Sequence, residues 1–420
     1  MRRKGLIILV LIFIQLAGFH VFSQQRFPKP EFESGYEQPD TSTPEPRSLE
    51  LEYTDVLVLL LVMSLATYFA IKNRSRKGIL WLSVFTLLYF GFYREGCICA
   101  IGSVQNVALS LFSADYSVSL PVLAFFALPL LFTLFFGRVF CGGACPLGVI
   151  QDLVVIRPIK VPVGVQKALG LFPYLYLGFA ILFAATGTDF IICRYDPFVG
   201  IFRMGAEFHL IVLGISFLLI GMFVGRPYCR FVCPYGVLLS WFSRFSKYHL
   251  SITPSKCIQC KLCTNSCPFD AIEAPSKGEE RKLGVASVKK FMAYAAIIPA
   301  MVLAGGYLIS ESHALFAKVH PKVHLADLLI EHPEMKNNTT NLDIETFMTS
   351  GQSMESLTEE AGEIRNMFYE GGWILGGFLG LAISIFFLNQ FIFRKKEDYH
   401  PHKGNCISCG RCMEYCPVKK

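Results

Sequence analysis

The chain has 420 residues, of which 53% are hydrophobic and only 17% are charged. Both values lie well away from those of an average soluble domain. Fifteen cysteines in so long and apolar a chain argue against a small disulfide-stapled secreted scaffold, and a net charge of +7 in such a chain does not indicate a nucleic-acid partner. The composition therefore predicts an integral membrane protein.

Eight apolar segments are long enough to cross a bilayer. They occupy residues 5–22, 54–71, 79–97, 119–136, 169–187, 209–225, 291–309 and 372–393. The first follows a basic start, so it is either a cleaved signal peptide or a signal anchor. We expect an all-α integral membrane protein with about eight transmembrane helices.

Lysine and arginine residues set the predicted orientation. With a cytoplasmic N-terminus, 29 of the 39 fall on the inner side of the membrane. This is the positive-inside bias of membrane proteins. We therefore expect a multi-pass protein of the bacterial inner (cytoplasmic) membrane, surrounded by lipid, with the N- and C-termini both in the cytoplasm.

A repeated motif occupies the middle of the chain. Residues 137–149 read G-R-V-F-C-x3-C-P-L-G-V, and residues 225–237 read G-R-P-Y-C-x3-C-P-Y-G-V. Each copy ends a two-helix unit, and both units run in the same direction, so a pseudo-twofold axis along the membrane normal would relate them. The motif cysteines are Cys141, Cys145, Cys229 and Cys233. They could form a redox or additional metal site at the cytoplasmic face, or they could be small packed apolar groups beside helix ends.

Two copies of a ferredoxin motif, C-x2-C-x2-C-x3-C-P, flank the last two predicted spans. Their cysteines are Cys257, Cys260, Cys263 and Cys267 in the first copy and Cys406, Cys409, Cys412 and Cys416 in the second. In two-cluster ferredoxins with this spacing, the fourth cysteine of each motif ligates the other [4Fe–4S] cluster. Joined in that way, Cys267 would complete the second site and Cys416 the first. The alternatives are a zinc site or free thiols.

Three further cysteines, Cys97, Cys99 and Cys193, lie at the outer ends of the third and fifth segments. They are candidates for an iron site or an outer cluster, for a disulfide between Cys97 and Cys193, or for packing alone. Nearby Glu95, Asp189 and Asp196 could pass protons, as quinol oxidation requires, or could be solvated interface charges.

Histidines occur in the predicted outer loop, where His320 and His324 have i, i+4 spacing. That spacing would suit a metal or haem iron if both lay on one helix face. Pro321 lies between them, and solvated histidines on an acidic loop are the simpler interpretation.

These features divide the chain into ten predicted segments. In order, they are a signal anchor or signal peptide (1–23), a periplasmic linker (24–53), a transmembrane helix (54–78), the first membrane repeat (79–158), the second membrane repeat (159–248), the first cytoplasmic ferredoxin half (249–285), a transmembrane helix (286–310), a periplasmic loop (311–371), a transmembrane helix (372–394) and the second cytoplasmic ferredoxin half (395–420). The two halves would form one small ferredoxin-like 2[4Fe–4S] module.

Paired C-x3-C-P motifs with ferredoxin motifs on the same side resemble the membrane polyferredoxins of the NapH/NosR type, the 4Fe–4S quinol dehydrogenase membrane subunits. The resemblance covers roughly residues 79–272 and 360–420. It implies two [4Fe–4S] clusters on the eight ferredoxin cysteines and redox-essential C-x3-C-P pairs. A further Fe–S or iron centre and a bound quinone are additional candidates.

The same resemblance implies electron transfer between the quinol pool or a cytoplasmic donor and a periplasmic respiratory reductase or its accessory system, of the nitrate or nitrous-oxide type. A redox protein would then be the partner on the periplasmic side, the cytoplasmic side or both. Two departures are the short linker where the nitrous-oxide type has a flavin domain, and the separation of the ferredoxin motifs by two spans. The alternatives are a metal-cofactor maturation reductase of the cytochrome-oxidase accessory type and a redox sensor.

Overall fold

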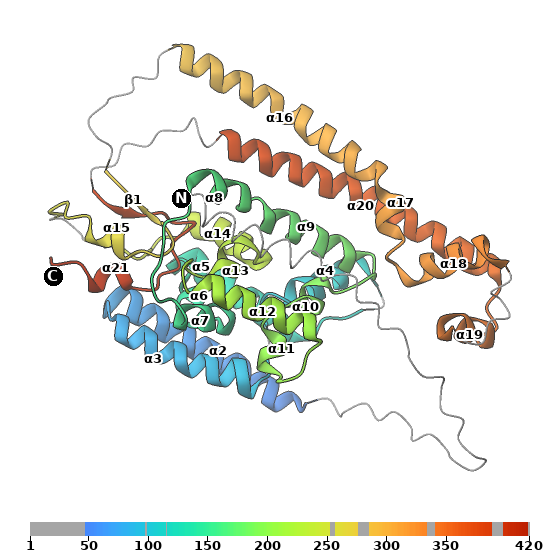
Figure 1. Cartoon of the computed structure of the whole chain (residues 1–420), viewed down its shortest axis with the longest axis horizontal. Coiled ribbons are helices and arrows are strands. Elements are labelled where there is room, and N and C mark those ends of the chain that lie inside the picture. Colours follow the sequence, from blue (N-terminus) through green and yellow to red (C-terminus); the bar gives the residue numbers. More distant parts are fainter. Residues whose placement is uncertain are drawn as a thin grey trace.

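The computed structural model describes residues 47–96, 99–114, 116–252, 257–275, 285–333, 341–388 and 398–418. Across these residues the chain is mostly helical, and its two short strands form one sheet (Figure 1). The predicted signal segment, most of the linker after it and Cys97 lie outside the described residues.

Four helices are long and apolar enough to cross a membrane, judged by length and composition. They are Leu49–Lys72, Val163–Ala185, Met292–Glu311 and Met354–Leu388. The predicted spans 119–136 and 209–225 correspond to shorter apolar helices, Leu120–Phe136 and Phe208–Gly221. The chain is thus a multi-pass membrane protein, while the predicted number of eight spans stays a prediction.

The helices before the ferredoxin module build two membrane units. Those of the first unit and its approach are α2 (Leu49–Thr67), η2 (Tyr68–Lys72), α3 (Arg76–Thr86), η3 (Leu87–Tyr93), α4 (Ser103–Phe112), α5 (Leu120–Phe136), α6 (Val139–Gly143) and α7 (Pro146–Leu153). Those of the second are α8 (Val163–Leu169), α9 (Phe172–Ala185), α10 (Ile191–Arg194), α11 (Val199–Phe202), α12 (Phe208–Gly221), α13 (Pro227–Phe231) and α14 (Pro234–Arg244). Each C-x3-C-P motif follows a long apolar helix and occupies a short helix and the start of the next one.

Proline sets the start of the last helix in each unit. Pro146 and Pro234 are the first residues of α7 and α14, a position where the missing N–H and the fixed φ of proline cost nothing. The preceding cysteines, Cys145 and Cys233, are therefore the N-cap residues. The Cys-Pro step in the sequence thus places one thiol of each motif at a helix N-terminus.

The ferredoxin halves lie at one end of the molecule (Figure 1). They comprise α15 (Leu262–Ser266), β1 (Ile272–Glu273), β2 (His400–Pro401) and α21 (Arg411–Glu414). Between β1 and β2 the chain inserts a long hairpin of α16 (Val285–Glu311) and α20 (Met354–Leu388). The two strands pair antiparallel, with Ile272 opposite Pro401, and so close the module around its inserted hairpin.

Small residues hold the hairpin together. Gly372, Gly376 and Gly380 recur every four residues on α20, and the backbone of α16 passes close against them. A Cβ on Gly376 would collide with the carbonyl oxygen of Gly305 on α16. This is the small-residue packing by which helices approach closely in lipid, where burial of apolar surface gives little drive.

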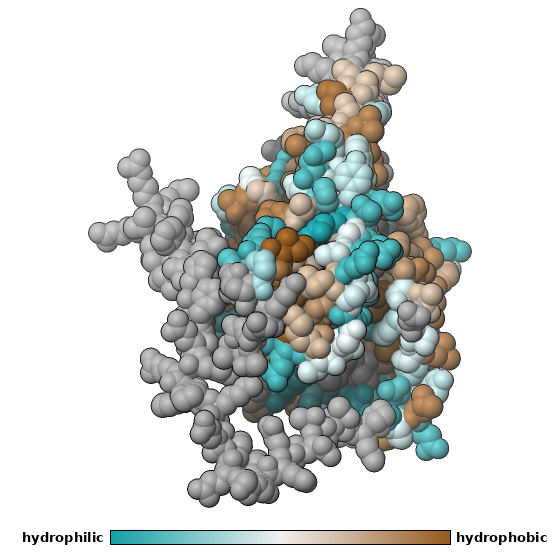
Figure 2. Space-filling view, turned by 90° about the vertical axis from the view of Figure 1, so that its right-hand side faces the viewer, coloured by the Kyte–Doolittle hydropathy of each residue, from teal (hydrophilic) through white to brown (hydrophobic). Residues whose placement is uncertain are grey.

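The predicted periplasmic loop contains helices in the structure. They are α17 (His313–Ala317), α18 (Pro321–Glu331), α19 (Leu342–Thr349) and the first turns of α20, at the end opposite the ferredoxin halves (Figure 1). They share an apolar core that includes Val323, Leu329, Phe347 and Phe368. Seen from that end, the surface mixes hydrophilic and apolar residues (Figure 2). The polar composition of this segment concealed a small helical unit.

We predict that Gly376→Ala destabilises the protein by about 1–3 kcal/mol, because the added methyl group forces α16 and α20 apart. The measurement is thermal unfolding of the purified protein in detergent. Gly362→Ala is the matched control on the same helix, since a Cβ there meets nothing within 4 Å and alanine favours the helix. Equal losses in the two variants would contradict the close helix packing.

Candidate iron–sulfur and cysteine sites

The two ferredoxin loops share one backbone conformation. Gln259 and Lys261, on either side of Cys260, have φ of 52° and 62°, and Ser408 and Gly410, on either side of Cys409, have φ of 55° and 78°. A left-handed conformation costs a non-glycine residue roughly 1–2 kcal/mol. Both loops adopt this conformation at equivalent positions, at a cost for Gln259, Lys261 and Ser408 but not for Gly410, and it wraps three cysteines around one centre. Of these four residues, only Gly410 is of a type from which a positive φ could have been predicted in the sequence.

Two cavities divide the eight ferredoxin cysteines between them. The first-half cavity is lined by Cys257, Cys260, Cys263 and Cys416. The second-half cavity is lined by Cys267, Cys406, Cys409 and Cys412. Each cavity thus combines three cysteines of one motif with the fourth of the other, which is the grouping expected from the pseudo-symmetric arrangement. That these thiols ligate clusters stays a prediction.

The chemistry of the donor set suits iron–sulfur clusters. In the second-half cavity three thiols are buried, and burial raises the pKa of Cys406 to about 12. A buried thiolate needs a nearby positive charge, which bound iron supplies. In the first-half cavity Cys260 is exposed, so that cavity lies nearer to solvent.

The four C-x3-C-P cysteines lie together where the two membrane units meet. Cys145 is close enough to Cys229 and Cys233 to interact electrostatically, and Gln151 of the first unit donates to Cys229 Sγ at 3.3 Å. Cys145 and Cys233 start helices, where the helix dipole favours a thiolate. Within the described part of the chain, no three His, Cys, Asp or Glu side chains converge tightly enough for a single metal ion. We call these four residues the inner quartet.

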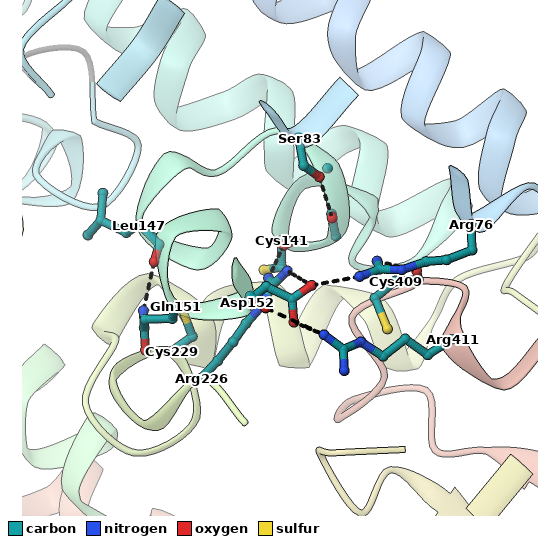
Figure 3. Close-up of polar contacts among 12 residues, drawn as sticks. Arg76, Ser83, Cys141, Leu147, Gln151, Asp152, Arg226, Cys229, Cys409 and Arg411 are labelled. Atoms are coloured by element: carbon teal, nitrogen blue, oxygen red, sulfur yellow. Dashed lines mark hydrogen bonds and ion pairs between the residues drawn. The ribbon is translucent and has the colours of Figure 1, made fainter. Parts of the chain in front are cut away.

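A buried carboxylate joins the membrane units to the ferredoxin module. Asp152 on α7 lies 3.0 Å from Arg76 on α3, 3.4 Å from Arg226 beside α13 and 3.1 Å from Arg411 on α21 (Figure 3). Burial alone would raise the pKa of Asp152, but the three guanidinium groups lower it to about 2. The carboxylate is therefore ionised throughout the physiological pH range. Arg76 also donates to the carbonyl oxygen of Cys409 at 2.8 Å.

Glycines let the module approach the inner quartet. A Cβ on Gly142, next to Cys141, would stand 2.5 Å from the carbonyl oxygen of Ile407. A Cβ on Gly225 would stand 2.8 Å from that of Pro268. Each glycine belongs to one repeat and faces one ferredoxin half. The module thus docks on both membrane units at once.

The outer cysteines lie on the far side of the inner quartet. Cys99 and Cys193 line a cavity of about 290 Å³ together with Asp196, and Cys97 lies outside the described residues. Cys99 also shares a smaller cavity with Cys145, so the outer and inner cysteines are neighbours across one void. The proposed disulfide between Cys97 and Cys193 involves a residue outside the described part of the chain.

Asp189 and Asp196, at the outer end, have different surroundings. Asp196 is buried, and its carboxylate accepts from the backbone N–H groups of Phe198 at 2.8 Å and Val199 at 3.2 Å. Burial raises its pKa to about 6. Asp189 instead pairs with the exposed side chain of Arg194. The solvated-charge interpretation fits Asp189, whereas Asp196 is a structural cap that faces the outer cavity.

The histidine pair does not form a shared helix face. His320 is the N-cap of α18, and its ring accepts from the backbone N–H of Lys322 at 3.2 Å. His324 lies inside the helix one turn later. Pro321 at the first helical position explains the difference, because the helix begins only after His320.

Sequence reasoning missed the arginines around the quartet. Arg138 and Arg226 occupy the same place in the two repeats, three residues before the first cysteine, and both side chains are buried. Their recurrence beside recurring cysteines was the available signal. The sequence carried no comparable signal for Asp152 and Arg411, because these two residues are far apart in the chain and meet only in the folded protein.

We predict that Asp152→Asn costs about 3–5 kcal/mol, because it leaves three guanidinium groups without their shared carboxylate. The measurement is thermal unfolding, with limited proteolysis to detect release of the ferredoxin module. Asp189→Asn is the control, since it removes a solvent-exposed ion pair worth at most about 1 kcal/mol. A cost as small as that of the control would contradict a central role for Asp152.

Known protein families match the segments that contain these cysteines. Residues 118–163 and 207–253, which contain the C-x3-C-P motifs, match a family described as a 4Fe–4S binding domain. Residues 250–273 and 403–419, which contain the ferredoxin motifs, match further families described in the same words. The chain therefore contains 4Fe–4S binding domains in its membrane units and in its ferredoxin halves.

Relatives among curated proteins differ in how much of their length the chain covers. The regulatory protein NosR of Stutzerimonas stutzeri is 27% identical over 222 residues, 48% of this chain and 29% of NosR. The putative electron transport protein YccM of Escherichia coli is 24% identical over 187 residues, 40% of this chain and 52% of YccM. The chain thus spans about a third to a half of these two relatives. No solved structure gives a significant match.

An archaeal relative is covered more fully. The uncharacterized protein MJ0750 of Methanocaldococcus jannaschii is 30% identical over 192 residues, which make up 43% of this chain and 77% of that protein. The chain belongs to the same family as MJ0750.

Proposed function

We propose that this protein is a membrane-bound iron–sulfur electron-transfer protein that links its ferredoxin end to its outer end. The observation that carries the proposal is the order of the cysteine sites along the molecule. Ile407 lines both the second-half cavity and a cavity beside Cys233 of the inner quartet, and Cys145 shares a cavity with Cys99. The sites therefore follow one another toward the outer end.

The proposal includes three cluster sites. The first-half and second-half cavities would each hold a [4Fe–4S] cluster through four cysteines, and the inner quartet would hold a third. A [4Fe–4S] cluster accepts and releases one electron at a time. Support for the third site comes from the 4Fe–4S family match over both C-x3-C-P motifs and from the two buried arginines beside the quartet.

The chain's own residues would keep these sites in a dry, rigid setting. Asp152 and its arginines fix the module against the membrane units, and Gln151 orients Cys229. A hydrocarbon core of roughly 30 Å is too thick for one efficient electron step, so a series of sites is required. Exposure of Cys260 places the first-half cavity where a soluble donor or acceptor can approach.

The physiological route is proposed from the relatives. YccM is named as a putative electron transport protein and NosR as a regulatory protein, so we infer a respiratory role that connects the quinol pool or a cytoplasmic donor with a periplasmic redox partner. In this arrangement both termini and the ferredoxin module face the cytoplasm of a bacterial inner membrane. The helical unit of α17, α18 and α19 would then face the periplasmic partner.

Vectorial electron transfer tests the proposal. The protein is reconstituted into liposomes with cytochrome c trapped inside, and reduced soluble ferredoxin is added outside. We expect the trapped cytochrome c to be reduced by wild type and at least tenfold more slowly by Cys145→Ser, which interrupts the inner quartet. Reduction of the trapped cytochrome c no faster than in liposomes that lack the protein would refute transmembrane electron transfer. Reduction of the clusters by added menaquinol would identify quinol as the donor.

We predict that the wild-type protein contains about twelve iron atoms per chain, four for each proposed site. Cys233→Ser should lose about four of them while the signals of the two ferredoxin sites persist in electron paramagnetic resonance spectra. An iron content of about eight that Cys233→Ser leaves unchanged would remove the third site from the proposal.

Double substitutions test how the ferredoxin halves share their ligands. We expect Cys416→Ser combined with Cys257→Ser to lose no more iron than either single variant, because both residues line the first-half cavity. Cys416→Ser combined with Cys406→Ser should lose iron from both cavities, because Cys406 lines the second-half cavity. The reverse pattern would show that each motif binds its own cluster. Iron and sulfide analysis of the purified variants gives the answer.

A further inference from the structure

Cys99 and Cys193 come together from the two membrane units. Cys99 precedes α4 of the first unit, and Cys193 lies in α10 of the second. Both thiols adjoin Gly102: Cys99 Sγ faces its backbone N–H group, and a Cβ built on it would stand 2.9 Å from Cys193 Sγ. The two thiols are also close enough to interact electrostatically. The absence of a side chain at Gly102 thus lets the two thiols lie near each other.

Buried polar contacts hold these two segments together. Gln105 on α4 is fully buried, and its side-chain oxygen accepts from the backbone N–H of Ile192 at 2.9 Å. Tyr176 on α9 donates to the carbonyl oxygen of Ile191 at 3.2 Å. Both contacts act on the residues just before Cys193. The position of Cys193 beside α4 is therefore set by the packing of the two units.

The two thiols lie at different depths. Cys193 is exposed, whereas Cys99 is partly buried. Cys99 is near enough to Cys145 of the inner quartet to interact electrostatically, and these two residues line one cavity. Cys99 also lines the outer cavity, together with Cys193 and Asp196. The pair therefore connects the inner quartet with the outer surface.

We infer that Cys99 and Cys193 form a dithiol–disulfide couple that receives electrons through the inner quartet and reduces a disulfide of a protein on the outer side. The inference rests on the proposed function, which supplies the electrons. In the oxidised couple a bond joins the two sulfur atoms. Two electrons, which arrive one at a time, and two protons break this bond and give two thiols. Asp196 lines the same cavity and is placed to pass these protons.

Exposure decides the roles of the two cysteines in the second step. The exposed Cys193 attacks one sulfur atom of the partner's disulfide, and the other sulfur leaves from the resulting mixed disulfide. Cys99 then attacks Cys193 Sγ, which releases the partner's second sulfur and restores the internal bond. The proton lost by each attacking thiol is taken up by a departing sulfur. Protein disulfides persist on the oxidising outer side of a bacterial membrane.

Disulfide mapping tests the inference. The iron-loaded full-length protein is placed in nanodiscs and oxidised with glutathione disulfide, and reduced soluble ferredoxin is then added. Thiols are blocked by alkylation under denaturing conditions, and the peptides are identified by mass spectrometry. We expect a peptide pair linked through Cys99 and Cys193 before the addition and alkylation of both residues after it, at least tenfold more slowly in Cys145→Ser. The control variant Cys97→Ser should keep the linked pair.

Three results of the mapping would overturn the inference. They are alkylation of both residues before the addition, a link between Cys97 and Cys193 in place of the expected one, and loss of iron from Cys99→Ser, which would indicate a metal site. Clusters that are reduced in electron paramagnetic resonance spectra while the link persists would refute this inference alone. Clusters that ferredoxin does not reduce would refute the proposed function as well.

A second measurement tests transfer to a protein disulfide. The protein is reconstituted into liposomes with insulin, a disulfide-bonded protein, trapped inside, and reduced ferredoxin is added outside. We expect wild type to reduce the trapped insulin at least tenfold faster than Cys193→Ser, as counted by alkylation of the cysteines of insulin. Equal rates for the two proteins would overturn transfer from Cys193 to a protein disulfide.

Discussion

The attachment of the ferredoxin module to the membrane units depends on the buried carboxylate of Asp152. It brings together arginines from α3, from the turn before α13 and from α21, three elements that are distant in the sequence. One carboxylate does not balance three guanidinium groups, and Arg76 already donates to the backbone of Cys409. Under the proposed ligation, the anionic cluster of the second-half cavity provides the remaining negative charge. Docking of the module and the charge of its cluster are then physically coupled.

The repeat explains how so much positive charge is buried beside four thiols. Each arginine approaches a glycine of the opposite unit, Gly148 for Arg226 and Gly236 for Arg138, at the end of the C-P-x-G step. A Cβ at Gly148 would stand 2.7 Å from Arg226 Nη1, so the guanidinium group would have to shift, whereas a Cβ at Gly236 would be in tight contact with Arg138 Nη2 at 3.3 Å. The two units therefore contact each other through these arginines, and we expect a substitution at one of these glycines to alter the surroundings of the cysteines in both repeats.

Motif spacing and hydropathy, which depend on residues close together in the sequence, predicted part of the fold and of the cysteine sites. The ferredoxin spacing predicted the grouping of Cys416 with the first motif, and hydropathy predicted the long helices around residues 54–71 and 372–393. The helices of residues 311–371 were missed because their polar surface hides a core that forms only when α18 packs on α20. The arginine network was missed because its members come from separate segments.

The hairpin inserted between β1 and β2 has a consequence for biogenesis. Under the proposed ligation each ferredoxin cluster needs cysteines from both sides of α16 and α20, so neither can be completed while the ribosome is still synthesising the hairpin. Cluster loading must wait until both helices have been inserted and the chain has returned to the same side of the membrane. A protein arrested with a failed hairpin would stay free of ferredoxin clusters, and the cell would be spared an unanchored redox centre. Under this ligation the insertion would act as a checkpoint in assembly.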